Sequence, residues 1–155
     1  MYPGKYAGQA PDRAAAILVE TGETLTYRCL EERSVRLAHV LRESGLRPGD
    51  VVALLTENNL RAFEVYWAAL RSGLYITAVN HNLSADEVAY IIEDSGASAL
   101  IVSSAKAELA SAVSERVREL PIRLSFGGVV EGFGCYEDAI AAASAVPFAD
   151  QPHGA

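Results

Sequence analysis

The sequence predicts an α/β fold in which a mostly parallel sheet carries helices on both faces and a β-hairpin lies at one edge. The apolar runs Val51–Leu55 and Tyr75–Val79 are separated by a helix-length segment with one apolar face. Two strands joined by a helix form a right-handed βαβ unit, so these strands are expected to be parallel. Two later runs, Ala99–Val102 and Ile122–Phe126, alternate with helical segments and extend the sheet. A length of 155 residues suits one domain with a substantial core.

The amino-terminal region is expected to lie outside the main sheet. Residues 1–13 contain two prolines and two glycines without an apolar period, so they are predicted to form a surface arm. The short runs Ala14–Val19 and Thr24–Tyr27 surround a polar turn, which is typical of a hairpin in which Gly22 supplies a positive φ. Residues 14–145 are predicted to make up a single α/β unit.

A helix is predicted from Tyr27 to Ser44, because apolar and small residues recur there at intervals of three and four. These residues are Leu30, Ser34, Leu37, Ala38 and Leu41. Thr26 is the expected N-cap, and Gly45 is the expected end of the helix. The following Arg47–Asp50 segment reverses the chain, since it has proline at the second turn position and glycine at the third.

The helix between the first two strands of the sheet is predicted to begin at a cap formed by Asn58 or Asn59 and to end at Gly73. It is expected to bury one stripe of large residues, which are Phe63, Trp67 and Leu70. Together with Tyr66, these aromatic residues could also suggest a binding box for a ligand. At helical spacing, packing in the core is the favoured interpretation.

The helices that follow have clear boundaries. Ser84 and Glu87 match the S-x-x-E capping box, in which each residue satisfies a backbone N–H of the other. The next helix is predicted over Ala105–Leu120 and stops before Pro121. Its expected inward residues are Leu109, Val113, Val117 and Leu120.

Beyond the last predicted strand the pattern weakens. A glycine-rich loop over residues 127–134 precedes a helix predicted over residues 135–145. Residues 146–155 contain two prolines and no period. They are predicted to be a linker rather than a packed element.

Composition limits the classes of function. A net charge of −7 and a pI near 4.9 argue against a nucleic-acid partner, which would need clustered Lys and Arg. Cys29 and Cys135 have no CxxC spacing, and neither a signal peptide nor an apolar run of ~18 residues occurs. These features predict a cytoplasmic protein without a transmembrane segment.

No complete catalytic constellation appears in the sequence. His81, Ser84 and Asp86 carry the residue types of a hydrolase triad, but triads converge from separate elements and Ser84 is better explained as a helix cap. His81 follows a strand, where ligands bind in such folds, so it either lines a ligand cavity or is a surface loop histidine. With His39 and His153 elsewhere, no metal-binding pattern is present.

The sequence does not favour a phosphate-binding glycine loop or a phosphoacceptor domain. The loop GGVVEGFG follows a strand and precedes a helix, yet it fits neither GxGxxG nor GxxxxGK[ST] and has no adjacent lysine. A flexible connector is the alternative. A phosphoacceptor receiver domain would need acidic residues at strand carboxyl ends. Asp50 instead precedes its strand, and Thr56 and Asn80 follow theirs.

An ordered set of short phrases resembles one family. The set begins with Leu25-Thr26-Tyr27, Leu30, Ser34, Leu37-Ala38, Leu41, Gly45, Gly49-Asp50-Val51-Val52-Ala53 and Asn58. It continues with Ala69, Gly73, Asn80, Leu83, Glu87, Tyr90 and Asp94-Ser95-Gly96-Ala97. This order resembles the amino-terminal region of AMP-forming acyl-CoA synthetases, in the adenylate-forming superfamily, and the stretch 73–97 resembles the fatty-acid-CoA ligases most. Cys29 stands where that family usually has Glu.

The resemblance implies a parent enzyme that uses ATP and Mg²⁺ to convert a fatty acid or other carboxylic acid into an acyl-adenylate. The acyl group then passes to the thiol of coenzyme A. The resemblance also implies a layering similar to Rossmann and flavodoxin-like folds, and it places Asn80, His81 and Asn82 near an acyl pocket. The family's phosphate loop, adenine and ribose motifs, hinge and catalytic lysine have no counterpart here.

The chain is therefore expected to be a truncated amino-terminal part of a ligase that contains no catalytic residue, metal site or cofactor site of its own. Residues 146–155 would lead toward the missing phosphate loop, and the remainder of the ligase would be the natural partner. Surfaces that dock this remainder would be exposed, so homo-oligomers are expected. The alternative is a stand-alone, non-enzymatic α/β binding or regulatory module derived from the ligases.

Overall fold

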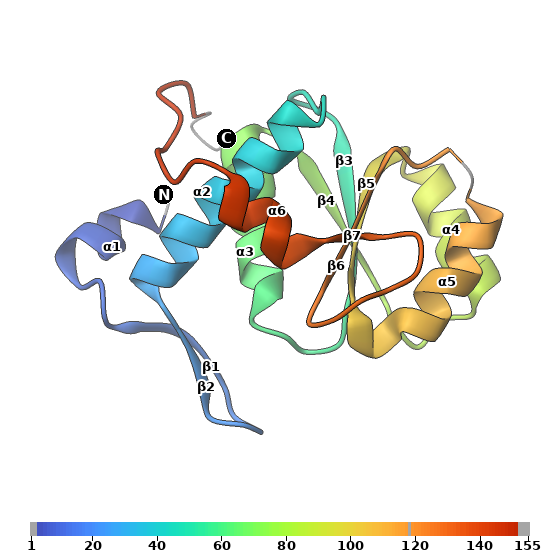
Figure 1. Ribbon diagram of the computed structural model, residues 1–155, viewed down its shortest axis with the longest axis horizontal. Coiled ribbons are helices and arrows are strands. Elements are labelled where there is room, and N and C mark those ends of the chain that lie inside the picture. Colours follow the sequence, from blue (N-terminus) through green and yellow to red (C-terminus); the bar gives the residue numbers. More distant parts are fainter. Residues whose placement is uncertain (1–2, 118, 152–155) are drawn as a thin grey trace.

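The computed structural model describes residues 3–117 and 119–151 (Figure 1). Its centre is a five-stranded sheet in the order β4-β3-β5-β6-β7, and each neighbouring pair is parallel. The strands are β3 (Val51–Leu55), β4 (Tyr75–Val79), β5 (Ala97–Ser103), β6 (Ile122–Phe126) and β7 (Gly134–Cys135). The prediction of an α/β fold with a mostly parallel sheet is confirmed.

Strand β3 is the pivot of the sheet. It pairs in register with β4 on one side, from Val51 with Tyr75 to Leu55 with Val79, and with β5 on the other. Four of its five residues are buried, which explains the unbroken apolar run, because a central parallel strand is covered on both faces. The chain leaves β3 toward β4 and later crosses to β5. The topological switch point therefore lies beside the carboxyl end of β3.

Two helical layers cover the sheet, as Figure 1 shows. Helices α2 (Tyr27–Glu43), α3 (Arg61–Ser72) and α6 (Tyr136–Ala142) lie on one face, where Leu37, Leu41, Ile101 and Phe126 belong to a shared core. Helices α4 (Ala85–Asp94) and α5 (Ala107–Arg116) lie on the other, around a second core that includes Val88, Leu100 and Val113. A single 3₁₀ turn, η1 (Ser104–Lys106), leads into α5.

The hairpin projects away from the main sheet (Figure 1). Strands β1 (Ala14–Leu18) and β2 (Glu23–Thr26) pair antiparallel, and Gly22 has φ +74°, as its place in the turn requires. The preceding residues, predicted as a patternless arm, include a short helix, α1 (Gly4–Gln9), which packs on α2 through a Tyr6–Tyr27 ring stack at 5.2 Å. The limits of the arm, the α/β unit and the linker remain predictions.

Most helix boundaries follow the sequence signals. Thr26 Oγ1 accepts a hydrogen bond from the Cys29 N–H at 3.3 Å, which caps α2. Ser84 and Glu87 form the complete capping box at the start of α4. The prediction that Asn58 or Asn59 caps α3 is wrong, because the N-cap is Leu60 and no side chain caps the helix. Asn59 lies one residue earlier, and its Oδ1 atom accepts a hydrogen bond from the Arg61 N–H at 3.0 Å.

The prediction for the buried face of α3 is wrong. Phe63 and Leu70 are 45% and 50% exposed, and Trp67 is partly buried against the hairpin, whereas Glu64 and Arg71 are fully buried. The reason is that α2 packs against the opposite face of α3, where small residues such as Ala68 and Ala69 allow close approach. Two buried charges are tolerated there because α2 supplies opposite charges.

Helix α5 is shorter than predicted, since it ends at Arg116 rather than Leu120. Val117 adopts an extended backbone, and its carbonyl oxygen accepts a hydrogen bond from Arg123 at 2.7 Å. Pro121 also disfavours a helical conformation at the residue before it. Val117 and Leu120 remain buried, as predicted, without being part of the helix.

The segment after α6 packs against α2, although no packed element was predicted there. The Arg36 guanidinium donates to the Ala143 carbonyl oxygen, and His39 Nε2 lies 2.8 Å from the Val146 carbonyl oxygen. Further along α2, Arg42 pairs with Asp150 at 2.9 Å and lies 4.0 Å from the centre of the Phe148 ring. Residues 152–155 of the predicted linker lie outside the described part of the chain.

Among residues 3–117 and 119–151, no helix combines the length and the apolar character of a membrane span.

Candidate site at the carboxyl edge of the sheet

The topological switch point makes the carboxyl edge of the sheet the first place to look for a ligand site. Residues 56–59 follow β3, Ser103 ends β5, and residues 80–82 follow β4. Because the strands are parallel, their carboxyl ends meet at one edge. Polar side chains from three strand ends are thereby brought to the same region.

Glu57 is the central polar residue of this edge. Its Oε1 atom accepts hydrogen bonds from the Ser103 hydroxyl at 2.9 Å and the Asn59 amide at 3.1 Å. Partial burial acts to raise the pKa of Glu57, but its own backbone N–H, Asn59 and Ser103 outweigh burial and lower the pKa below its usual value, helped by the charge of Lys106. The carboxylate is therefore ionised at neutral pH.

Beside Glu57 lies a hollow of about 470 Å³ between the tip of the hairpin and α3. Its polar side includes Thr56, whose Oγ1 atom is buried, as is Glu57 Oε2, and neither atom has a hydrogen-bond partner among the described residues. The apolar lining includes Ile17, Leu60, Phe63, Tyr66 and Ala78. The hollow therefore combines an anionic side with an apolar wall.

The predicted pocket residues Asn80, His81 and Asn82 form a turn after β4. Asn80 Oδ1 accepts the Asn82 N–H at 3.0 Å, and both asparagines are exposed. His81 is half-buried, and its Nδ1 atom has no hydrogen-bond partner in the described chain. None of the three lines the hollow beside Glu57. Their approach to an acyl pocket stays a prediction.

The glycine-rich loop between β6 and β7 does not suit a phosphate. The Gly127 N–H donates to the Glu137 carboxylate at 3.2 Å, so an acidic side chain occupies the donor that a phosphate would need. Within residues 3–117 and 119–151, no group of three His, Cys, Asp or Glu residues is placed to hold a metal ion. The Gly127 amide of this loop is therefore already engaged by a carboxylate.

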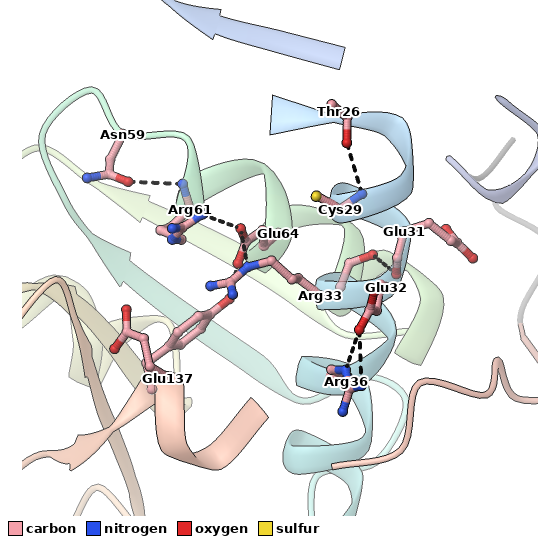
Figure 2. A network of polar contacts seen from close by, with 12 residues as sticks. Thr26, Cys29, Glu31, Glu32, Arg33, Arg36, Asn59, Arg61, Glu64 and Glu137 are labelled. Atoms are coloured by element: carbon pink, nitrogen blue, oxygen red, sulfur yellow. Dashed lines mark hydrogen bonds and ion pairs between the residues drawn. The ribbon is translucent and has the colours of Figure 1, made fainter. Parts of the chain in front are cut away.

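A buried ionic cluster joins three helices beneath this edge, and Figure 2 shows its core. Glu64 of α3 accepts from Arg33 of α2 at 2.7 Å, from Arg61 at 2.8 Å and from the Tyr136 hydroxyl of α6 at 2.8 Å. Burial and the Glu64 charge raise the pKa of Tyr136 well above its usual value. Although burial opposes it, Glu64 also raises the pKa of Arg33. The cluster stabilises the packing of the three helices.

A second buried pair reinforces the α2–α3 contact. Arg71 donates to Glu31 at 2.6 Å and to the Ser34 hydroxyl at 3.0 Å. Sequence reasoning placed Ser34 on the inward face of α2, which is correct, but it missed Glu64 and Arg71. Their spacing could have indicated this face, because Glu64 and Arg71 are seven residues, or two helical turns, apart and the small residues Ala68 and Ala69 lie between them.

Comparison with known proteins gives consistent matches. The family model described as "AMP-binding enzyme" matches residues 5–152. The fatty acid–acyl-carrier-protein ligase ScoC of Streptomyces coeruleorubidus is 43% identical over 81 residues, which are 52% of this chain and 15% of that protein. The 3-oxocholest-4-en-26-oate–CoA ligase of Rhodococcus rhodochrous is 40% identical over 91 residues, 59% of this chain and 16% of that protein.

Solved structures agree with these matches. A protein from Rhodopseudomonas palustris, named as a long-chain-fatty-acid CoA ligase, superposes with a TM-score of 0.83 at 28% identity, over 98% of this chain and 37% of that chain. The amino-terminal domain of FACL13 from Mycobacterium tuberculosis superposes with a TM-score of 0.81 at 24% identity, which shows the shared fold. This chain covers 37% of that domain. It therefore spans a minor part of each of these proteins.

Proposed function

The chain belongs to the AMP-binding enzyme family, whose model matches residues 5–152, and from that premise we propose that it is the amino-terminal part of an ATP-dependent fatty-acid-CoA ligase. Two observations together support the proposal. The family model matches nearly the whole chain, yet the aligned part of this chain makes up only 15% and 16% of two ligase relatives. The activity would belong to the longer protein, with this chain as a structural part of it.

In the proposed reaction, a carboxylate oxygen of the substrate bonds to the α-phosphorus of ATP and pyrophosphate leaves, which gives an acyl-adenylate. The thiol of coenzyme A then bonds to the acyl carbon, and AMP leaves with the electron pair of the broken bond. Mg²⁺ would supply charge neutralisation at the phosphates. No residue of the described chain is assigned a step, because its glycine-rich loop and acidic edge do not fit the phosphates.

The contribution of this chain would be a rigid wall beside the catalytic parts. The Glu64 cluster and the Arg71–Glu31 pair hold α2, α3 and α6 on one face of the sheet. This arrangement leaves the carboxyl edge, with the turn from Asn80 to Asn82, free to face the remainder of the ligase. We assign these residues to the rim of the acyl pocket as part of the same proposal. Exposed, unpaired Cys29 and Cys135 are in keeping with a cytosolic location.

The proposal is tested by sequencing the reading frame beyond residue 155 and assaying the longer protein that it encodes. We expect the frame to encode, soon after residue 155, a Ser/Thr/Gly-rich loop ending in Lys-Gly, and the longer protein to release pyrophosphate from ATP when a fatty acid is added. A lysine-to-alanine variant in that loop is the matched control and is expected to abolish release. A stop codon after Ala155 would contradict the proposal and favour the stand-alone binding or regulatory module.

A further inference from the structure

The segment after α6, residues 143–151, forms no helix or strand of its own and runs beside α2 (Figure 1). We call it the strap. Two of its backbone carbonyl oxygens are held by α2 side chains three residues apart. The Arg36 guanidinium donates to the Ala143 oxygen, and His39 Nε2 lies 2.8 Å from the Val146 oxygen. Since a carbonyl oxygen only accepts, this ring nitrogen carries the hydrogen. The first half of the strap is therefore bound through its backbone.

The second half of the strap is held mainly by Arg42, three residues beyond His39 on α2. Two Arg42 nitrogens donate to the Asp150 carboxylate at 3.1 and 2.9 Å, a geometry that fixes both partners in orientation. A surface ion pair alone contributes little. Here the same guanidinium also lies 4.0 Å from the centre of the Phe148 ring, which in turn lies 4.1 Å from the His39 ring. Arg42 thus contacts two strap residues at once.

The strap ends against α3. Gln151 Nε2 donates to the Phe148 carbonyl oxygen at 3.1 Å, and Gln151 Oε1 accepts from Arg71 of α3 at 3.4 Å. Arg71 is fully buried and also holds Glu31 of α2. Ordering a segment without secondary structure costs conformational entropy, which these contacts offset. The course of the chain at residue 151 is thereby fixed relative to both helices.

We propose that Arg42 is a positioning residue of the ligase, which holds the strap so that the phosphate loop following it begins at a fixed place beside the sheet. The inference rests on the proposed function, in which that loop comes soon after residue 155. A free linker would have to be ordered each time ATP binds. A strap that is already ordered removes this entropy cost and favours ATP binding. Arg42 acts through the strap and does not itself touch ATP.

Nitrogen-15 relaxation of the 155-residue protein tests the attachment of the strap. Backbone order parameters of residues 148–151 are expected to be about 0.85, as in rigid backbone, and to fall below about 0.6 in Arg42→Ala and in Asp150→Ala. The matched control is Arg28→Ala, which removes the same charge from the first turn of α2, where Arg28 pairs with Asp12. It is expected to leave the strap rigid. Unchanged values for residues 51–55 would show that each variant is folded.

Steady-state kinetics of the longer protein test the positioning role. Arg42→Ala is expected to raise KM for ATP about fivefold or more and to leave KM for the fatty acid within about twofold. A general loss of stability would not separate the two constants. Arg42→Lys keeps the charge but cannot bind both carboxylate oxygens, so an intermediate KM for ATP is expected. Arg28→Ala is expected to leave both constants unchanged.

The outcomes separate this inference from the proposed function. Wild-type order parameters below about 0.6 in residues 148–151 would overturn the inference. An active longer protein in which Arg42→Ala loosens the strap without changing KM for ATP would overturn the positioning role alone. A wild-type longer protein that releases no pyrophosphate from ATP would overturn the proposed function, and the positioning role with it.

Discussion

Replacing Glu64 by glutamine tests whether the buried ionic cluster determines the packing of the helices. The substitution keeps the size of the side chain and one acceptor oxygen but removes the negative charge, which leaves the guanidinium groups of Arg33 and Arg61 without their common counter-charge. Their side chains are 26% and 29% exposed, so water partly compensates them, whereas Glu64 is fully buried. Removing one partner of a buried pair costs about 3–5 kcal/mol. The partial exposure of both arginines places the expected loss near the lower limit, about 3 kcal/mol.

The assay is urea unfolding followed by circular dichroism, in which a loss of this size is equivalent to a fall in Tm of about 6–12 °C for a chain of this length. The matched control is Glu32→Gln. Glu32 pairs with Arg36 on the same helix layer but is 50% exposed, and a surface pair contributes about 0–1 kcal/mol. Equal losses for Glu64→Gln and Glu32→Gln, or a loss below about 1 kcal/mol for Glu64→Gln, would refute the reasoning.

Four further substitutions give independent checks. Tyr136→Phe should reduce the loss of stability on the alkaline side: because the pKa of Tyr136 is raised in the folded state, its contribution is complete below about pH 10 and falls as pH rises toward the folded pKa, which urea titrations from pH 8 to 11 would measure. Glu57→Gln should flatten the acid side, since the pKa of Glu57 is lowered on folding and its contribution present above about pH 4.3 is lost as pH falls through the folded value; an unchanged slope below pH 5 would disagree. Ser84→Ala should cost about 1 kcal/mol in urea unfolding through loss of the capping box, and an effect below experimental error would count against it. Phe148→Ala should release residues 143–151 from α2, seen as faster proteolytic cleavage there with an unchanged core, because the ring contacts both His39 and Arg42.

Local patterns predicted much of the fold. The bounds of β3, β4 and β6 agree with the predicted strands residue for residue. In β3 the run has no polar interruption because this central strand is covered on both faces. The capping box at Ser84 and the positive φ of Gly22 and Gly73 are likewise set by a few adjacent residues. Strand β7 escaped prediction because two residues, Gly134 and Cys135, carry no pattern at all.

The errors come from contacts between distant segments. The buried negative charge of Glu64 is paired with Arg33, which lies 31 residues earlier in the chain. Helical periodicity places charged residues on the solvent side, and it therefore predicted the wrong buried face for α3. The order of strands around β3, which creates the switch point, depends on how helices pack rather than on any one stretch. For the same reason the Glu57–Ser103 hydrogen bond, across 46 residues, had no local signal.

The measurement that tests the account most directly is isothermal titration of the 155-residue protein with ATP and Mg²⁺, and then with a non-hydrolysable acyl-adenylate analogue. The account predicts no heat of binding in either titration, because the glycine-rich loop donates its Gly127 amide to Glu137 and the edge beside Glu57 is anionic. Clear stoichiometric binding would contradict it. It would show that the carboxyl edge of this sheet is itself a nucleotide site and would make the stand-alone binding module the better description of the protein.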